Sequence, residues 1–270
     1  MTLPKVIPQK WSADMISNEV YRAGFVTVPA TIQHWMSSHG GLEGKQVLDF
    51  GCGYGTSALG LALRNSLTRV VGMDIVSDPL RCESLAREQI GLDESPNNLS
   101  LHHVRVGTMP DAAARFDLAY AWSVFEHVNH ELLVPALRQI HDVLRPGGKI
   151  IIQMNPLFYS ATGSHLDPWI PGPWAHLIDQ DSTYREKMLK GAKSDQSLYE
   201  ALVRLYGTLN RLTVKDFRLL LDQTGFSVIL DKYHIDHREI PAPLLNVYHE
   251  NVLREQGIAV LAERRIDRPK

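Results

Sequence analysis

The sequence contains little cysteine. Cys52 and Cys82 are the two cysteines among 270 residues. Two cysteines this far apart form neither a disulfide framework nor a metal-ligand spacing. The sequence therefore predicts a protein of a reducing compartment, and we expect a cytoplasmic location.

Long hydrophobic runs are also lacking. No stretch approaches the roughly 18 uninterrupted apolar residues of a membrane-spanning helix. The opening residues, MTLPKVIPQKWSADM, have neither the apolar core nor the cleavage pattern of a signal peptide. We therefore expect neither a membrane span nor a secretion signal.

Positive and negative charges are nearly balanced, so that neither sign is in large excess. Twenty-eight Lys and Arg residues face 30 Asp and Glu residues, which gives a formal net charge of -2. A protein that holds nucleic acid through its phosphates needs a basic face. The balance of charge argues against a nucleic-acid-binding protein.

What the sequence does contain is a regular alternation of short apolar strands and helices. The predicted strands cover 47–50, 70–75, 99–106, 116–122, 149–154, 226–233 and 257–263. The predicted helices cover 56–65, 79–91, 132–144 and 213–224. Such alternation indicates an α/β fold, a doubly wound and mostly parallel sheet of the Rossmann-like kind with helices on both faces.

Two regions depart from this alternation. Residues 1–41 form an N-terminal helical segment, whose helix over 14–38 is disturbed between Gly24 and Pro29. Residues 155–212, after the fifth strand, carry several prolines and aromatic residues before helical patches return. We expect one domain over 1–270, with 155–212 inserted as a lid on the substrate side.

The stretch VLDFGCGYG joins the first strand to a helix through glycines. Glycines at such a turn let a ligand meet bare backbone. A dinucleotide site would have G-x-G-x-x-G/A, but here Thr56 takes the last position. Asp49 would repel a pyrophosphate and attract an ammonium, whereas Asp74 ends the second strand, where an acid commonly accepts from ribose hydroxyls. A ligand with a ribose and a cationic amine but no phosphate fits S-adenosylmethionine (SAM).

Four stretches together resemble the landmarks of class I SAM-dependent methyltransferases, in particular the broad small-molecule subgroup. They are VLDFGCGYG, VVGMDI, FDLAYAWSVFEHV and LRPGGKIIIQM, in that order within 42–154. A later stretch, NRLTVKDFRLLLDQTGF, is similar to the family's helix before the sixth strand. The resemblance implies a seven-stranded sheet whose last two strands pair with the seventh inserted antiparallel. It also implies SAM as cofactor and S-adenosylhomocysteine (SAH) as product.

The resemblance further implies which residues bind the cofactor. Carried over by matching position, they are Asp49, Gly51, Cys52, Gly53, Asp74, Ile75, Thr108, Met109, Trp122 and Ser123. The glycine turn would meet the methionine portion, and Cys52 would be an inert small residue within it. The family often has Gly-Asp after the third strand, whereas this chain has Gly107 and Thr108, so that the Thr108 hydroxyl or the main chain would meet the adenine amine instead.

Three histidines are candidate catalytic residues. His127 follows the fourth strand at the carboxyl edge of the sheet, where ligands bind in open α/β folds, and His165 and His176 lie in the insertion. Imidazole titrates near neutral pH and can take a proton from a nucleophile. In the alternative, His127 is structural and bonds to backbone. His165, Asp167 and His176 could bind a metal, but their spacing matches no ligand pattern, so we expect pocket-lining residues and no metal.

These observations together predict in-line methyl transfer from SAM to oxygen or nitrogen of a small-molecule acceptor. The polar and aromatic insertion favours a small molecule, such as a sugar-bearing or natural-product scaffold. Three alternatives stay open: a nicotinamide-dependent oxidoreductase, the same fold used for a reaction other than methylation, and a non-catalytic partner that binds the cofactor. The sequence identifies neither the acceptor nor the oligomeric state.

Overall fold

The computed structural model describes residues 16–76, 80–110 and 115–266. The strands are β1 (Gln46–Phe50), β2 (Arg69–Asp74), β3 (Leu99–His103), β4 (Phe116–Trp122), β5 (Leu144–Met154), β6 (Phe226–Ile235) and β7 (Glu255–Arg264). The longer helices are α2 (Val28–Ser37), α3 (Thr56–Arg64), α4 (Leu80–Ile90), α5 (Leu133–Val143), α7 (Asp181–Gly191), α8 (Gln196–Thr208) and α9 (Val214–Gln223). Four further α-helices are short: α1 (Glu19–Arg22), α6 (Ala175–Ile178), α10 (Ala242–Leu245) and α11 (Glu250–Arg254).

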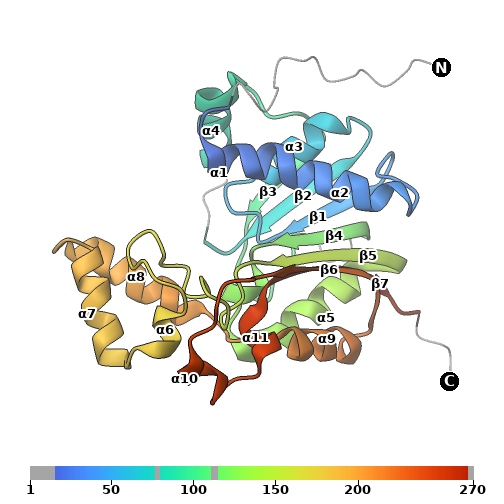
Figure 1. Ribbon diagram of the computed structural model, residues 1–270. Coiled ribbons are helices and arrows are strands. Elements are labelled where there is room, and N and C mark those ends of the chain that lie inside the picture. Colours follow the sequence, from blue (N-terminus) through green and yellow to red (C-terminus); the bar gives the residue numbers. More distant parts are fainter. Residues whose placement is uncertain (1–15, 77–79, 111–114, 267–270) are drawn as a thin grey trace. The chain divides into compact units, whose positions relative to one another are not determined.

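The seven strands form one sheet in the order β3-β2-β1-β4-β5-β7-β6 (Figure 1). β1 pairs in parallel with both β2 and β4, and β2 pairs in parallel with β3. The chain thus starts in the middle of the sheet and winds outward, which confirms the predicted doubly wound α/β fold. The seventh strand is inserted between the fifth and the sixth, as the resemblance implied.

The chain divides into two compact units. The first, unit 1, consists of 1–122, 138–151 and 261–270, and unit 2 consists of 123–137 and 152–260. Unit 1 contains the glycine turn, and unit 2 contains the three candidate histidines and the predicted insertion. In unit 2, α7 and α8 lie side by side, and α9 packs against β6 (Figure 1).

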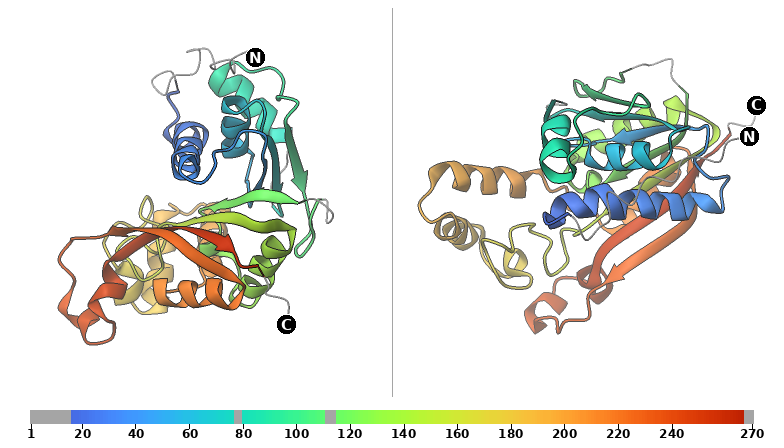
Figure 2. Two further views of the ribbon diagram at one scale, coloured as in Figure 1. Left: turned by 90° about the vertical axis from the view of Figure 1, so that its right-hand side faces the viewer. Right: turned by 90° about the horizontal axis from the view of Figure 1, so that it is seen from above.

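The N-terminal helical segment of unit 1 changes its winding where the sequence predicted a disturbance. A π-helical turn over Ala23–Thr27 joins α1 to α2, and the three run on as one rod beside α3 (Figure 2). Pro29 has no N–H to donate to the Phe25 carbonyl one turn earlier. Arg64 of α3 supplies the missing donor, with its Nη1 2.8 Å from the Phe25 oxygen. The disturbance therefore widens the helix and leaves its course unbroken.

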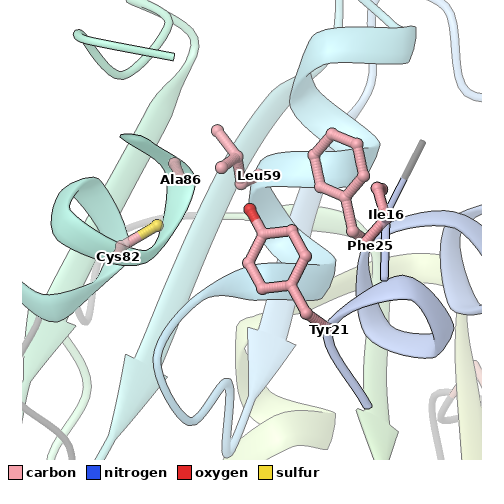
Figure 3. Packing of buried hydrophobic residues seen from close by; sticks show 6 residues of the cluster. All are labelled: Ile16, Tyr21, Phe25, Leu59, Cys82 and Ala86. Atoms are coloured by element: carbon pink, nitrogen blue, oxygen red, sulfur yellow. The ribbon is translucent and has the colours of Figure 1, made fainter. Parts of the chain in front are cut away.

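An apolar cluster holds this rod to the neighbouring helices. Its buried members are Ile16, Tyr21, Phe25, Leu59, Cys82 and Ala86. Figure 3 shows the Tyr21 ring with its hydroxyl directed toward Leu59 on α3 and the residues of α4. Leu59 belongs to α3, the helix that begins at the glycine turn. The cluster therefore packs α3 against the N-terminal rod and α4.

Some boundaries differ from the predicted ones. β5 begins at Leu144 and includes the Pro146-Gly147-Gly148 stretch that was expected to separate helix from strand. β3 ends at His103 because its later residues turn away from the sheet. The short helices α10 and α11 were not predicted at all. Pro79, the expected start of a helix, lies outside the described residues.

Candidate active site

The glycine turn crosses the carboxyl ends of β1 and β2 in unit 1. Gly51, Gly53 and Gly55 have φ values of 75°, 56° and 77°, in the left-handed region that side chains disfavour. The Gly51 and Cys52 N–H groups both donate to the Met73 carbonyl, at 2.8 and 3.0 Å. At Gly53, a Cβ would meet no atom within 4 Å, so this part of the turn presents bare backbone to open space.

Asp74 ties the end of β2 to the turn. Its Oδ2 accepts from the Gly53 N–H at 2.9 Å, and its Oδ1 accepts from the Val76 N–H at 2.7 Å. Asp74 is partly exposed. The next residue, Ile75, is 51% exposed. A partly exposed acid and an exposed apolar side chain therefore follow one another at the end of β2.

Asp49, unlike Asp74, is buried. It is 1% exposed, and its Oδ2 accepts from the Tyr120 and Ser57 hydroxyls, both at 2.7 Å. The Ala58 N–H also bonds to this carboxyl, and burial raises its pKa to about 7. Asp49 therefore joins β1, β4 and the start of α3 beneath the turn.

The remaining predicted cofactor residues occupy the ends of β3 and β4. Thr108 is exposed and Met109 is half-buried. The Thr108 hydroxyl donates to the Arg105 carbonyl at 2.7 Å, so its oxygen keeps its acceptor capacity, which suits an amine donor. Trp122, half-buried, ends β4. Ser123, at the start of unit 2, has φ 55° and bonds through its N–H and hydroxyl to the Gln153 side chain.

Cys52 lies between the glycines and is partly buried. Burial, with the nearby Asp49, raises the pKa of its thiol far above the ordinary value. A thiol with such a pKa is a poor nucleophile at neutral pH. This placement supports the prediction of an inert residue.

His127 lies in a 3₁₀ turn over Phe125–His127, in unit 2. Its Nδ1 is 3.1 Å from the Thr208 hydroxyl oxygen. The Thr208 hydroxyl donates its single proton to the Leu205 carbonyl at 2.8 Å, so it must accept from an Nδ1–H of His127. The lone pair of the neutral ring is then on Nε2. Burial, with His165 nearby, lowers the His127 pKa to about 4, which keeps the ring neutral at pH 7.

His165 and His176 bond to backbone within the insertion. The His165 Nε2 donates to the Pro156 carbonyl at 2.9 Å, and the His176 Nε2 donates to the Phe158 carbonyl at 2.6 Å. Trp174 adds a third such bond, from its indole N–H to the Tyr159 carbonyl at 3.1 Å. Three aromatic N–H groups thus satisfy three carbonyls of the 156–159 loop, which gives these residues a structural task.

The His127 and His165 rings are in edge contact. Their centroids are 4.9 Å apart and their planes are inclined by 76°. His176 is buried at 7% exposure, and burial lowers its pKa to about 4. Within the described ranges, no group of three or more His, Cys, Asp or Glu side chains is arranged to hold a metal ion.

A clamp that the sequence did not reveal holds the His127 turn. The Asn210 side-chain amide donates to the carbonyls of Phe125 and Val128, and the Asn210 N–H donates to the Glu126 carbonyl at 3.1 Å. Asn210 lay in the predicted insertion, just before the helix predicted over 213–224, and nothing in its local pattern indicated contact with residues more than eighty positions earlier. Ser57 and Tyr120 were likewise missed, because their role depends on Asp49 being buried.

Glu126 is an unusual neighbour of His127. It is 4% exposed, its Oε1 accepts from the Asn155 N–H at 3.3 Å, and its Oε2 has no hydrogen-bond partner in the described part of the chain. Burial raises its pKa to about 8. The raised pKa favours the neutral carboxylic acid at pH 7.

Residues 47–148 match the family model of a methyltransferase domain. Over these residues the chain is similar to a methyltransferase domain. That stretch runs from β1 through the turn and β4 to the start of β5, and includes Asp49, Asp74 and His127.

Curated relatives support the assignment. The chain is 30% identical over 131 residues to a ubiquinone biosynthesis O-methyltransferase from Acinetobacter baylyi, covering 47% of this chain and 52% of that protein. It is also 30% identical over 129 residues to the protein of that name from Pseudomonas syringae pv. tomato, with the same two coverages. The chain thus spans about half the length of the curated relatives it matches.

Solved structures resemble the whole fold. Magnesium protoporphyrin IX methyltransferase from Synechocystis PCC 6803 with bound SAH aligns with a TM-score of 0.55 at 17% identity, covering 92% of this chain and 87% of that chain. A SAM-dependent methyltransferase from Mesorhizobium loti aligns with a TM-score of 0.50 at 17% identity, covering 83% and 92%. At this identity the likeness shows the methyltransferase fold.

Among the residues that are described, no helix has the length and apolar character needed to cross a membrane.

Proposed function

We propose that this protein transfers the methyl group of SAM to a hydroxyl oxygen of a small molecule. Names of relatives that contain the word O-methyltransferase agree with this choice. The observation that carries it is the state of His127, a neutral imidazole whose Nδ1–H bonds to Thr208 and whose Nε2 has no hydrogen-bond partner among the described residues. A hydroxyl acceptor needs such a base, whereas a neutral amine needs proximity alone.

The proposed cofactor site uses the predicted residues of unit 1. Asp74 would accept from the ribose hydroxyls, with Ile75 and Met109 beside the adenine and the Thr108 oxygen near its amine. The backbone of Gly51, Cys52 and Gly53 would lie against the methionine portion. Asp49 would act as a buried negative charge behind the turn. When bound, the cofactor supplies a methyl group that its sulfonium has already activated.

Residues on the proposed acceptor side would exclude water and take the proton of the hydroxyl. Trp122 and Ser123 would exclude water beside the sulfonium. His127 Nε2 would take the hydroxyl proton as the oxygen–carbon bond forms and the sulfur–carbon bond breaks, which leaves SAH, a methyl ether and a protonated His127. His165 and His176 would hold the loop against which His127 packs. We further propose that 155–212 contributes the acceptor-side groups, and that the two free thiols reflect a cytoplasmic location.

The first test identifies the bound cofactor and asks whether its methyl group is transferred to an acceptor. Mass spectrometry of the purified protein should detect SAM or SAH. A nicotinamide dinucleotide would instead support an oxidoreductase. Bound cofactor without transfer to any acceptor would support a repurposed fold or a non-catalytic partner.

The second test addresses the base. Matched hydroxyl and amine acceptors should be offered to the wild-type protein and to His127→Gln. The variant should lose hydroxyl methylation by roughly 10²–10⁴-fold while binding SAH as before. His130→Gln, an exposed histidine three residues away, should match the wild type. Equal hydroxyl turnover in wild type and His127→Gln would overturn the assignment of the base.

A further inference from the structure

Arg211 is a cation of unit 2 that forms no ion pair with an acidic side chain among the described residues. It follows Asn210 in the link between α8 and α9, with φ 59°, and its side chain is exposed. Its guanidinium carbon lies 4.8 Å from the centroid of the Phe158 ring. No hydrogen bond or ion pair of its side chain occurs within the described ranges. A guanidinium stacked on a ring keeps its N–H edge open for a planar anion.

The backbone beside Arg211 is firmly held. The preceding Asn210 makes three hydrogen bonds to the turn over Phe125–His127 and to Val128. The same turn carries His127, whose Nδ1 bonds to Thr208, the last residue of α8. The base and the cation are therefore presented by two segments that are tied to each other.

The surroundings of Arg211 are aromatic and polar. Phe158 is in ring contact with His176 and Tyr206, at centroid distances of 5.1 and 6.0 Å. Burial raises the pKa of Tyr159 and Tyr206, and the charge of Arg211 opposes that rise at both. Burial lowers the pKa of His176, and the nearby His165 and Arg211 lower it further. His165 is in turn in ring contact with His127, so neighbouring residues connect Arg211 to His127.

We propose that Arg211 binds an acidic group of the acceptor, which makes the acceptor an aromatic hydroxy acid. The inference rests on the proposed function and deepens it. The carboxylate would accept two parallel N–H bonds from the guanidinium, as in bidentate arginine–carboxylate pairs. Half-buried Tyr159 and Tyr206 offer ring surface to the planar body of the ligand. His127 would receive the proton of the hydroxyl at the other end.

The test compares an acid with its uncharged twin. Para-hydroxybenzoate and its methyl ester should be titrated into the SAH-loaded protein, with binding followed by ligand-observed NMR. The wild type should prefer the acid by about tenfold or more, as expected for one charge-assisted pair. Arg211→Gln should bring the preference to within about twofold, and Arg211→Lys should retain part of it. Arg204→Gln, an exposed arginine on α8, is the matched control and should behave as the wild type.

Three outcomes would overturn the inference: equal affinity for acid and ester in the wild type, an acid preference that persists in Arg211→Gln, or no binding of the acid to SAH-loaded protein. Failure of the proposed function itself is separate, because it would appear as absent SAH binding before either probe is added.

Discussion

At the scale of single residues, the candidate site contains two buried acids, Asp49 and Glu126, whose pKa values are raised by burial. Asp49 bonds to Tyr120, Ser57 and the Ala58 N–H, and is fully enclosed. Burial is the largest cause of its raised pKa of about 7, the two hydroxyls oppose it, and Asp74 adds to it. Protonation of Asp49 near neutral pH would therefore remove the negative charge that we propose it provides behind the turn.

The first prediction follows from this competition. If the ionised Asp49 favours SAH, affinity for SAH should rise about tenfold from pH 6 to pH 8. Tyr120→Phe removes a hydrogen bond that lowers this pKa, so the rise should move to higher pH. Calorimetric titration across that range checks both statements. Tyr233→Phe, an exposed tyrosine of unit 2, serves as control, and identical pH profiles for wild type and Tyr120→Phe would contradict the account.

The second prediction concerns Glu126, whose folded-state pKa of about 8 lies above that of an unfolded glutamate. The stability that this gives is fully present below the unfolded pKa and is lost as pH rises through about 8. Wild type should therefore lose up to ~1.4 kcal/mol per pH unit relative to Glu126→Gln between about pH 5 and 8. Urea denaturation of both proteins at several pH values measures the difference. Parallel stability curves would show that Glu126 ionises normally.

At the scale of elements, the N-terminal rod and α3 meet at one very close contact. A Cβ on Gly60 would lie 2.2 Å from the Phe25 carbonyl oxygen and 2.9 Å from the Pro29 ring. Arg64 bonds to that same carbonyl, so the contact has little freedom to open. The glycine lets the π-helical turn lie directly on the helix that begins at the cofactor turn.

The third prediction tests this contact. Gly60→Ala should destabilise the protein by about 1–3 kcal/mol, because the added methyl must displace backbone. Gly207→Ala is the matched control, since a Cβ there meets no atom within 4 Å and alanine favours a helix by about 0.5–1 kcal/mol. Thermal unfolding distinguishes the two. A Gly60→Ala protein as stable as the wild type would show that the rod shifts easily.

At the scale of the whole molecule, local patterns predicted the fold better than they predicted the site. The alternation of strands and helices is local, and β4 was predicted with its observed bounds. The Thr213–Asp216 capping box, readable from four residues, begins α9 as expected. The glycine turn and Asp74 could be predicted for a similar reason, because each stands in a short and distinctive stretch, VLDFGCGYG and VVGMDI.

Contacts between distant residues could not be predicted in this way. Asp49 is enclosed by Tyr120, 71 positions later, and the His127 turn is held by Asn210. The left-handed backbone at Arg211 and the N–H bonds of His165 and His176 to the 156–159 loop depend on tertiary packing. The acceptor side of the protein is therefore the part on which the sequence was least informative.

The central claim is that the turn between β1 and α3, with Asp74, binds a SAM-type cofactor. Calorimetric titration of SAH and of NADH into wild type, Asp74→Ala and Glu94→Ala tests it most directly. The account predicts SAH binding by the wild type, a tenfold to hundredfold loss in Asp74→Ala from about 1.5–3 kcal/mol of hydrogen bonding, no loss in the exposed-acid control Glu94→Ala, and no measurable binding of NADH. Binding of NADH in place of SAH, or unchanged SAH affinity in Asp74→Ala, would contradict it.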